Sequence, residues 1–265
     1  MQKALDQLTT YLTPLDLSDW RYYAEVGSTN DIALDWALAG AKDYSLVIAD
    51  TQSAGRGREN RRWVTQPGAA LAMSLILRPG QAERGFIPRF TALPALALIE
   101  VLEKIGVEAQ LKWPNDVLIT GKKVAGVLVE ADWQADQLVA LVVGMGVNVS
   151  PESVPSADVL RYPATCIESE LGVEVDRWAI LASILHTLKR GREILPTEDF
   201  INVWNNSLAF KGDWVNFRFS DGQPRQAQVS SVQADGRLSL RMPDGDYLDV
   251  VAGEIEWSRP DGQQD

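Results

Sequence analysis

An arginine-rich segment between two apolar runs is the feature that most constrains this chain. Four arginines fall within residues 56–62 of a 265-residue protein whose formal net charge is −11. Because the chain as a whole is acidic, these cations need a local explanation, and the segment predicts an anion site. Arginine suits a phosphate or carboxylate because its planar fork donates two parallel hydrogen bonds. Trp63 follows and offers a flat face for a nucleobase or apolar ring. Such segments are also typical of solvated loops and of sequence-blind nucleic-acid binders, so the segment alone leaves its ligand open.

The flanks of this segment indicate a long loop between two strands. Residues 45–51 and 70–77 are apolar runs of the kind that forms buried strands. The connection Gln52–Gly68 is longer than most connections in a compact domain, and such loops are often functional lids. We therefore expect it to order over its ligand. Gly55 and Gly57 predict positive φ angles in the loop, with close approach of an anion to the backbone amides.

Length and composition limit the class of protein. The chain is long enough for one large domain and a small one, and 46% hydrophobic with 23% charged residues is typical of a soluble globular protein. No signal-peptide pattern and no apolar run approaching 18 residues is present, so we expect a cytoplasmic protein without a membrane partner. The sequence pI of about 4.7 argues against a general affinity for nucleic acid.

Single cysteine and histidine residues exclude several kinds of chemistry. Cys166 permits no internal disulfide, and with His186 it cannot form a metal site built from cysteine and histidine. His186 lies in a run with helical periodicity, where a surface or packing role is the usual one. We therefore expect no Ser-His-Asp or Cys-His catalytic unit.

Hydrophobic periodicity and turn residues predict the other elements before residue 210. Helices are expected over residues 5–12, 30–39, 91–105, 176–192 and 197–207, and strands over 22–26, 116–120, 123–131 and 137–149. Pro94 is expected in the first turn of its helix, where a missing amide is tolerated.

A second polar stretch, residues 112–116 (KWPND), follows a short strand. Lys112 ends that strand, and Pro114 forces a turn directly after it. Gly126, inside an apolar strand, indicates that a ligand or another backbone passes close by. Asn148 closes a later strand and is placed to contact a base edge. Each signal is weak by itself, because a strand-end lysine and a turn asparagine are common structural residues.

The last 50 or so residues follow a different pattern. From Lys211 onward, short strands alternate with Asp-Gly pairs, which are typical of hairpin turns. We therefore expect a small β-barrel and place the domain boundary near residues 209–212. The predicted domains are residues 1–209, for binding and catalysis, and residues 210–265.

Taken together, these stretches resemble a biotin protein ligase, in the family's order and spacing from about Val26 to the end of the chain. The matching motifs are Gly27-Ser28-Thr29-Asn30, Gln52 with Gly55-Arg56-Gly57-Arg58 and Trp63, Lys112-Trp113-Pro114-Asn115-Asp116, Ala125-Gly126-Val127-Leu128-Val129-Glu130 and Gly144-Met145-Gly146-Val147-Asn148. One departure is Asn60, which stands where the family's arginine loop usually has its last glycine. Asparagine tolerates left-handed backbone better than most residues do, so the loop can keep its shape.

The resemblance implies an α+β fold, with helices packed on a mixed β-sheet as in class II aminoacyl-tRNA synthetases and biotin ligases, plus a small C-terminal SH3-like β-barrel. It implies an ATP-dependent ligase that activates biotin as biotinyl-5′-AMP, with Mg²⁺, and transfers it to a lysine. The acceptor would be a biotin carboxyl carrier protein of acetyl-CoA carboxylase or another biotin-dependent carboxylase. Longer family members carry an N-terminal DNA-binding domain, for which residues 1–20 are too few, so a ligase alone is implied. Dimers in the family form by sheet-edge pairing, and the sequence leaves a homodimer open.

By the same resemblance, Lys112 and Arg58 are the expected catalytic residues, because they would neutralise the biotin carboxylate and the α-phosphate as these meet. The expected biotin-binding residues are Ser28, Thr29, Asn30, Gln52, Gly55, Arg56, Gly57, Arg58, Lys112 and Gly126. The expected nucleotide-binding residues are Arg58, Arg61, Trp63, Asn115, Asp116, Lys112 and Asn148. No histidine or cysteine ligand to a metal is expected.

Two other functions remain open from the sequence. A lipoate or octanoate ligase or transferase shares the fold, but is expected to lack the arginine-rich loop and to need a longer apolar tunnel. A non-catalytic module that grips RNA phosphates with the loop is the second, and the acidic net charge argues against it.

Overall fold

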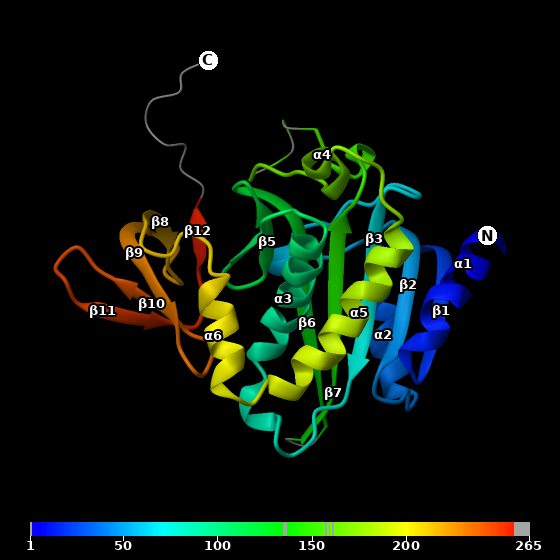
Figure 1. The fold of residues 1–265 in the computed structure, drawn as a ribbon. Coiled ribbons are helices and arrows are strands. Elements are labelled where there is room, and N and C mark those ends of the chain that lie inside the picture. Colours follow the sequence, from blue (N-terminus) through cyan, green and yellow to red (C-terminus); the bar gives the residue numbers. More distant parts are fainter. Residues whose placement is uncertain (1, 135–136, 157, 159, 161, 257–265) are drawn as a thin grey trace.

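A seven-stranded mixed sheet is the centre of the larger part of the chain in the computed structural model, which describes residues 2–134, 137–156, 158, 160 and 162–256 (Figure 1). Its strands are β1 Asp19–Val26, β2 Ser45–Gln52, β3 Ala70–Leu77, β4 Gln110–Lys112, β5 Asp116–Ile119, β6 Lys122–Gln134 and β7 Gln137–Asn148. They lie in the order β1-β2-β3-β7-β6-β5-β4. β1 pairs with β2 in parallel, and the other neighbouring strands are antiparallel.

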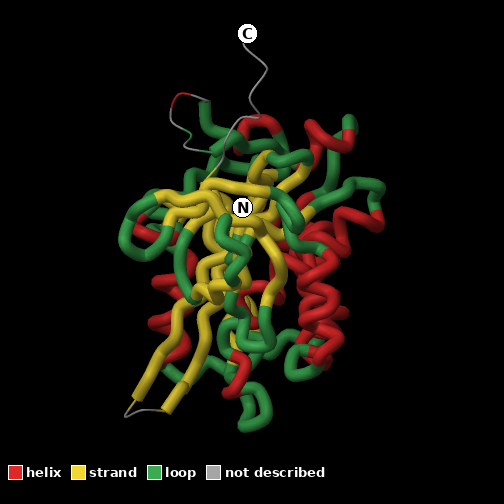
Figure 2. Tube along the Cα trace, turned by 90° about the vertical axis from the view of Figure 1, so that its left-hand side faces the viewer, coloured by secondary structure: helices red, strands yellow, loops and turns green. Residues whose placement is uncertain are grey.

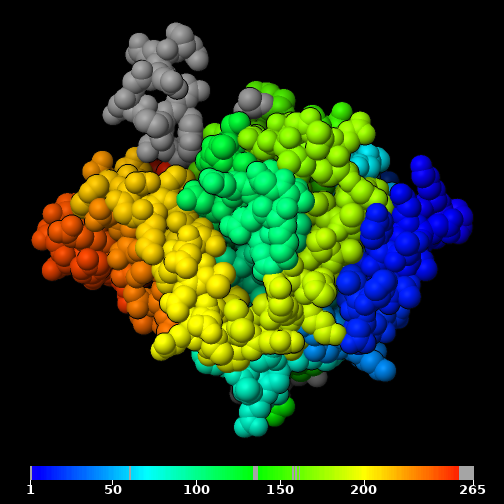
Figure 3. All heavy atoms as spheres, viewed as in Figure 1, coloured from blue at the N-terminus to red at the C-terminus, as the bar shows by residue number. Residues whose placement is uncertain are grey.

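Helices cover both faces of this sheet. They are α1 Gln2–Leu12, α2 Thr29–Leu38, α3 Arg89–Lys104, α4 Ile167–Leu171, α5 Arg177–Ile194 and α6 Glu198–Asn206. Successive strand residues point to opposite faces: Leu46 and Ile48 of β2 belong to the large core beneath α3 and α5, whereas Val47 packs with Ala33 and Trp36 of α2. Figure 3 shows α3, α5 and α6 as one surface over the face of the sheet to which Leu46 and Ile48 point.

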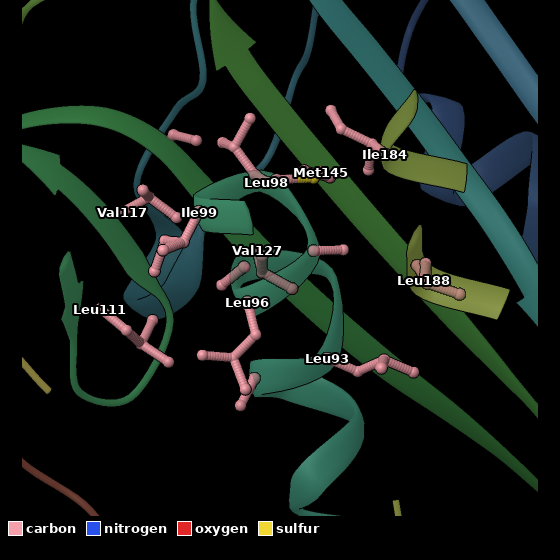
Figure 4. Close-up of a cluster of buried hydrophobic side chains, with 14 of the residues drawn as sticks. Leu93, Leu96, Leu98, Ile99, Leu111, Val117, Val127, Met145, Ile184 and Leu188 are labelled. Atoms are coloured by element: carbon pink, nitrogen blue, oxygen red, sulfur yellow. The ribbon is translucent and has the colours of Figure 1, made fainter. Parts of the chain in front are cut away.

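The large core holds the strands that carry the expected site residues. Figure 4 shows apolar side chains of α3 directed at the sheet and at α5: Leu93, Leu96, Leu98 and Ile99 of α3, Val117 of β5, Val127 of β6, Met145 of β7, and Ile184 and Leu188 of α5. Shortening one such side chain to alanine typically costs about 2–5 kcal/mol. β5, β6 and β7 are therefore fixed in place by packing on the face that α3 covers.

The predicted helices and strands of this part are confirmed to within a few residues, with one error at Pro94. The helix that carries Pro94 begins at Arg89, so the proline lies in its second turn and not in its first. The helix starts early because Arg89, which is 3% exposed, anchors that end. Its guanidinium donates to the carbonyls of Leu195 at 2.6 Å, Thr197 at 2.8 Å and Ala234 at 2.8 and 3.0 Å.

The C-terminal part is a five-stranded antiparallel sheet. Its strands are β8 Trp214–Arg218, β9 Pro224–Val232, β10 Leu238–Arg241, β11 Tyr247–Val250 and β12 Glu254–Glu256, in the order β11-β10-β9-β8-β12. The glycines of the three Asp-Gly pairs, Gly222, Gly236 and Gly245, have positive φ as expected for these turns. Within residues 210–256 no strand pairing joins β11 to β12. The second sheet is therefore present, and its closure into a barrel stays a prediction.

The two parts are joined by specific contacts, and the chain has further surface features. Trp113, after β4, donates its indole N–H to the carbonyl of Gly236 at 3.0 Å.

Figure 2 shows the far ends of β6 and β7 projecting as a strand pair beyond the rest of the sheet. His186 is exposed on α5, in line with a surface role, and Cys166 is buried. No helix in the described part of the chain is long and apolar enough to cross a membrane.

Candidate active site

A cavity of about 520 Å³ lies between the Gln52–Gly68 loop and the ends of the central strands. Every residue expected in the site lines it except Gly55. The expected residues that line the cavity are Ser28, Thr29, Asn30, Gln52, Arg56, Gly57, Arg58, Arg61, Trp63, Lys112, Asn115, Asp116, Gly126 and Asn148. Segments that are far apart in sequence thus converge on one cavity.

The arginine loop folds back on itself as a narrow hairpin. The amide of Gly57 donates to the carbonyl of Arg61 at 2.7 Å, and the amide of Trp63 donates to the carbonyl of Gly55 at 2.9 Å. The expected positive φ angles at Gly55 and Gly57 are wrong: Gly57 has φ −125°, and Glu59 is the left-handed residue, with φ 55°. The loop needs Gly55 for space instead, because a Cβ there would lie 2.4 Å from the carbonyl oxygen of Trp63. The side chain of Asn60 lies outside the described residues.

Arg56 ties this loop to the opposite wall of the cavity. Its guanidinium donates two hydrogen bonds to Glu130 of β6, at 2.9 and 2.7 Å, and lies 2.7 Å from Asp31 of α2. Glu130 also accepts a hydrogen bond of 2.7 Å from Asn30. The charge of Arg56 is therefore already compensated by two carboxylates.

Arg58 is the arginine of the loop that points at the KWPND turn. Its Nη1 donates to Oδ1 of Asn115 at 3.2 Å, and Asn115 in turn donates to the carbonyl of Val127 at 2.6 Å. Among the described residues, no carboxylate lies within ion-pair distance of Arg58. Asn115 therefore orients the guanidinium without neutralising it, so the charge can meet an anion.

Lys112 provides a second cation without a carboxylate partner among the described residues. It is 2% exposed, and its Nζ lies 3.9 Å from the centroid of the Tyr162 ring. Burial lowers the pKa of Lys112 to about 8, against the opposing effect of the nearby Asp116 and Glu254 carboxylates. A buried ammonium of this kind gains strongly from an incoming anion, because the low local dielectric enhances their attraction.

The other end of the cavity is a cluster of hydroxyl and amide groups. The amide and hydroxyl of Thr29 both donate to Oε1 of Gln52, at 2.8 and 3.0 Å. The hydroxyl of Ser74 of β3, which is fully buried, lies 2.8 Å from Thr29 Oγ1 and 2.6 Å from Asn30 Oδ1, and its one proton can go to either oxygen. Ser28 is 3% exposed, and its side chain makes no cap hydrogen bond at the start of α2. The cluster can recognise a small polar group by hydrogen bonds.

The Gly-x-Gly of β7 leaves room for two side chains that shape the cavity. A Cβ at Gly144 would lie 2.1 Å from Oδ1 of Asn30, and one at Gly146 would lie 2.2 Å from the indole of Trp63. Trp63 therefore packs directly on the backbone of β7. Asn148, at the end of the strand, is held by a 3.0 Å hydrogen bond to the carbonyl of Thr165.

Sequence reasoning missed several residues that line or support the cavity: Ser74, Lys123, Glu130, Tyr162 and Glu254. Ser74 carried a usable signal, because it is the one polar residue in the apolar run 70–77. Glu130 belongs to the motif of residues 125–130, but the sequence predicted no role for it. The others carry no local signal, since they come from segments that only the fold brings to the cavity.

Comparison with known proteins identifies the family. Residues 23–148 match the model of the biotin/lipoate A/B protein ligase family. The chain is 38% identical over 239 residues to the bifunctional ligase/repressor BirA of Bacillus spizizenii. The aligned region covers 89% of this chain and 73% of that protein. The chain belongs to the biotin protein ligase family. The resemblance inferred from the motifs is confirmed.

Other biotin protein ligases agree over nearly their whole length. The chain is 34% identical to the biotin–[acetyl-CoA-carboxylase] ligase of Paracoccus denitrificans, over 88% of this chain and 98% of that protein. Its fold matches that of the biotin protein ligase from Aquifex aeolicus in complex with biotin and ATP, with a TM-score of 0.76, 25% identity and coverage of 92% of this chain and 100% of that one.

Proposed function

We propose that this member of the biotin protein ligase family is an ATP-dependent enzyme that activates biotin as biotinyl-5′-AMP and transfers it to a lysine of a biotin carrier protein. One observation carries the proposal: a single cavity joins a hydroxyl and amide cluster to two cations, Arg58 and Lys112, that lack carboxylate partners among the described residues. The relatives named as biotin ligases, and the structural match to a ligase bound to biotin and ATP, support it.

The first step needs those two cations. A carboxylate oxygen of biotin attacks the α-phosphorus of ATP, the bond between the α-phosphorus and its bridging oxygen breaks, and pyrophosphate leaves. Two anions must approach each other, so Arg58 and Lys112 lower the barrier by neutralising both. Losing one such preorganised donor typically costs roughly 10²–10³ in rate.

In the second step, the amine of the acceptor lysine attacks the acyl carbon of biotinyl-5′-AMP. The mixed anhydride bond breaks, and AMP leaves. Because this anhydride reacts with water, a loop that covers the cavity protects it. The hairpin from Gly55 to Trp63 is suited to this role, since Arg56 ties it to β6 and Arg61 ties it to β12.

The polar cluster is the proposed site for the ureido ring of biotin. Ser28, Thr29 and Gln52 would provide donors and acceptors for the ring, and the backbone of the loop at Arg56 and Gly57 would provide others. Asn30 is better suited to a supporting role, because both ends of its amide already have partners in Ser74 and Glu130. Gly126 lines the cavity and leaves space there because it has no side chain.

The nucleotide is proposed to bind on the side of Trp63 and Asn148. Asn115 would orient Arg58 toward the phosphates. Asp116, the next residue, forms an ion pair with Lys123 at 2.6 Å. Arg61 would act mainly by closing the loop, since Glu254 and Glu59 hold its guanidinium. Mg²⁺ is expected to arrive as MgATP. The described residues contain no cluster of three metal-binding side chains, and Mg²⁺ commonly binds through substrate phosphates.

The finer points of the organisation are proposals as well. We propose that residues 1–209 form the catalytic domain and residues 210–265 a small SH3-like domain, whose five-stranded sheet is compatible with a barrel. The acceptor is proposed to be the biotin carboxyl carrier protein of acetyl-CoA carboxylase, or that of another biotin-dependent carboxylase. β1 and β4 are the edges of the central sheet, and pairing through such an edge is the proposed route to a homodimer.

The two other functions have less support. The relatives from Paracoccus denitrificans and Mycobacterium tuberculosis are named as biotin ligases, which does not favour a lipoate or octanoate enzyme. An RNA-binding role needs arginines that face solvent phosphates, but Arg56 and Arg61 are already in ion pairs.

The proposal is tested by incubating the protein with biotin, MgATP and a carrier domain. We expect biotin on one lysine of the carrier by mass spectrometry, and a loss of roughly 10²–10³ in rate for Lys112→Met. No transfer by the parent protein would refute the proposed function, and equal rates for an active parent and its variant would refute the role of Lys112.

A further inference from the structure

We propose that Arg177 is a positioning residue that holds the two ends of the Gln52–Gly68 loop together and so keeps the loop closed over the reaction intermediate. The inference rests on the proposed function and deepens it with a contact outside the cavity. Arg177 is the first residue of α5 and does not belong to the described residues that line the cavity. It would therefore act through the chain at the two ends of the loop.

The two strands that carry this loop separate before the loop begins. The pairing of β2 with β3 ends where Ala49 lies opposite Ala72. Beyond that point the end of β2 continues beside β1, and the start of β3 stays paired with β7. In the described strands, no ladder pair joins the residues of β2 after Ala49 to those of β3 before Ala72. The strand ladder alone therefore does not fix the distance between the two ends of the loop.

Arg177 bridges this gap with its side chain. Its Nη2 donates to Oδ1 of Asp50 in β2 at 2.5 Å, and its Nη1 donates to the carbonyl of Ala70 in β3 at 3.2 Å. Asp50 comes shortly before the first residue of the loop, and Ala70 comes shortly after the last one. Because the guanidinium is planar and its two arms have a fixed geometry, one side chain sets the separation of both ends.

The guanidinium is held in place before it meets the strands. It lies 4.0 Å from the centroid of the Trp178 ring, and Trp178 is 3% exposed. Asp176, the N-cap of α5, accepts a 2.9 Å hydrogen bond from the amide of Trp178 and so fixes the start of the helix. On the strand side, the hydroxyl of Tyr22 donates to the second oxygen of Asp50. Both partners of the ion pair therefore have further contacts that orient them.

The two strand ends also carry residues from both sides of the cavity. Gln52 follows Asp50 closely in β2 and accepts two hydrogen bonds from Thr29, in the cluster proposed for the ureido ring. Ala70 lies opposite Asn148 of β7, on the side proposed for the nucleotide. If the ends moved apart, the loop would shift relative to both ligands. Water would then reach the mixed anhydride more easily.

A second arginine of α5 gives a matched control. Arg192 binds the opposite ends of the same two strands: Asp43, before β2, at 2.9 and 3.0 Å, and the carbonyl of Arg78, after β3, at 3.3 Å. It also pairs with Glu83 at 2.6 Å. Its side chain is 10% exposed, against 14% for Arg177. Losing either arginine weakens the attachment of α5 to β2 and β3, but only Arg177 lies at the end that carries the loop.

The first experiment measures opening of the loop without substrates. Trypsin cleavage at the loop arginines is followed in the parent, Arg177→Met and Arg192→Met, at a temperature where circular dichroism shows all three folded. We expect Arg177→Met to raise the cleavage rate roughly tenfold, as for loss of a hydrogen bond to a charged group, and Arg192→Met to stay close to the parent. Because no substrate is present, the result does not depend on the ligase function. Equal cleavage of the two variants would overturn the proposal.

The second experiment measures protection of the intermediate, as AMP released per biotin transferred to a carrier domain. When water attacks the acyl carbon of biotinyl-5′-AMP, AMP leaves and free biotin returns, so this ratio rises above about one. We expect a ratio severalfold higher in Arg177→Met than in the parent. Arg192→Met should keep the parent ratio even where its rate falls, because a smaller folded fraction lowers both products alike.

Arg177→Lys keeps a charge beside Asp50 but lacks the second arm for the carbonyl of Ala70. We expect it to give intermediate values in both experiments, and it carries the test if Arg177→Met does not fold. A parent-like ratio in the Arg177 variants, with an active parent, would overturn the proposal while leaving the ligase function intact.

Discussion

Arg61 of the arginine loop and Glu254 of β12 form a bidentate ion pair across 193 residues of sequence, with one Nη1 to Oε1 distance of 2.8 Å. Glu254 lines the cavity, and Arg61 closes one end of the hairpin that covers it. The C-terminal sheet therefore holds the loop over the site. Movement of that sheet away from the central one would break this contact and leave the loop held through Arg56 and Glu130.

Glu254→Gln is expected to loosen this loop. Neutralising the carboxylate removes the ion pair that joins Arg61 to β12, a partly exposed pair worth about 1 kcal/mol, so the loop should open several times more often. Trypsin should cut at the loop arginines several-fold faster in the variant. Glu256, in the same strand as Glu254, forms a similar ion pair with Arg218 of β8. Glu256→Gln removes that pair and should leave loop cleavage as in the parent. Equal cleavage in both variants would show that Glu254 does not hold the loop.

The buried ammonium of Lys112 predicts a pH dependence. Burial lowers its pKa to about 8, so the free enzyme loses this charge as the pH rises through 8. Since the charged form binds phosphate, kcat/KM for ATP should fall above that pH, while kcat should fall less because bound anions favour the proton. Lys112→Arg should abolish the alkaline fall in whatever activity remains. A kcat/KM that is flat from pH 7 to 9.5 in the parent would contradict the assignment.

Gly146→Ala should displace Trp63. The new methyl group would lie 2.2 Å from the indole, so the ring has to move away from β7. Overpacking of this kind costs about 1–3 kcal/mol, and we expect kcat/KM for ATP to fall roughly tenfold or more. Gly85→Ala is the control, because a Cβ there meets no atom within 4 Å and φ is not positive. The idea fails if both variants keep the parent kinetics.

Arg89 is expected to be critical for stability and not for chemistry. Arg89→Met leaves the buried carbonyl of Leu195 and the partly buried carbonyls of Thr197 and Ala234 without their donor, which should lower the free energy of unfolding by about 3 kcal/mol. Arg237→Met removes an exposed pair with Asp235 and should cost less than about 1 kcal/mol. Urea denaturation monitored by tryptophan fluorescence measures both. Similar midpoints for the two variants would exclude a structural role for Arg89.

Much of the site could be predicted from the sequence, because its motifs carry their own chemistry. Lys112 ends a strand before a proline turn, and the arginine loop lies between two apolar runs, so periodicity and turn residues place both. Gly55 shows a limit of this reasoning. A glycine in a sequence indicates a position without a side chain, but only the fold shows whether a positive φ angle or a close neighbouring atom requires the glycine. Here the carbonyl of Trp63 requires it.

Charge compensation was the part that sequence could not provide. The arginines of the loop are equivalent in sequence, yet Glu130 and Glu254, from distant strands, neutralise Arg56 and Arg61 and leave Arg58 for an anion. Long-range pairing of this kind depends on how β6 and β12 lie beside the loop. For the same reason, the closure of the C-terminal sheet could not be decided from its turn signals.

The central claim is that Arg58 and Lys112 act together on the carboxylate of biotin and the α-phosphate of ATP. The most direct test is a single-turnover experiment with biotin and MgATP and no carrier, which measures biotinyl-5′-AMP and pyrophosphate. We predict near-stoichiometric formation of both products by the parent, and rates lower by roughly 10²–10³ for Lys112→Met and for Arg58→Met. Absence of adenylate in the parent, or unchanged rates in both variants, would contradict the account.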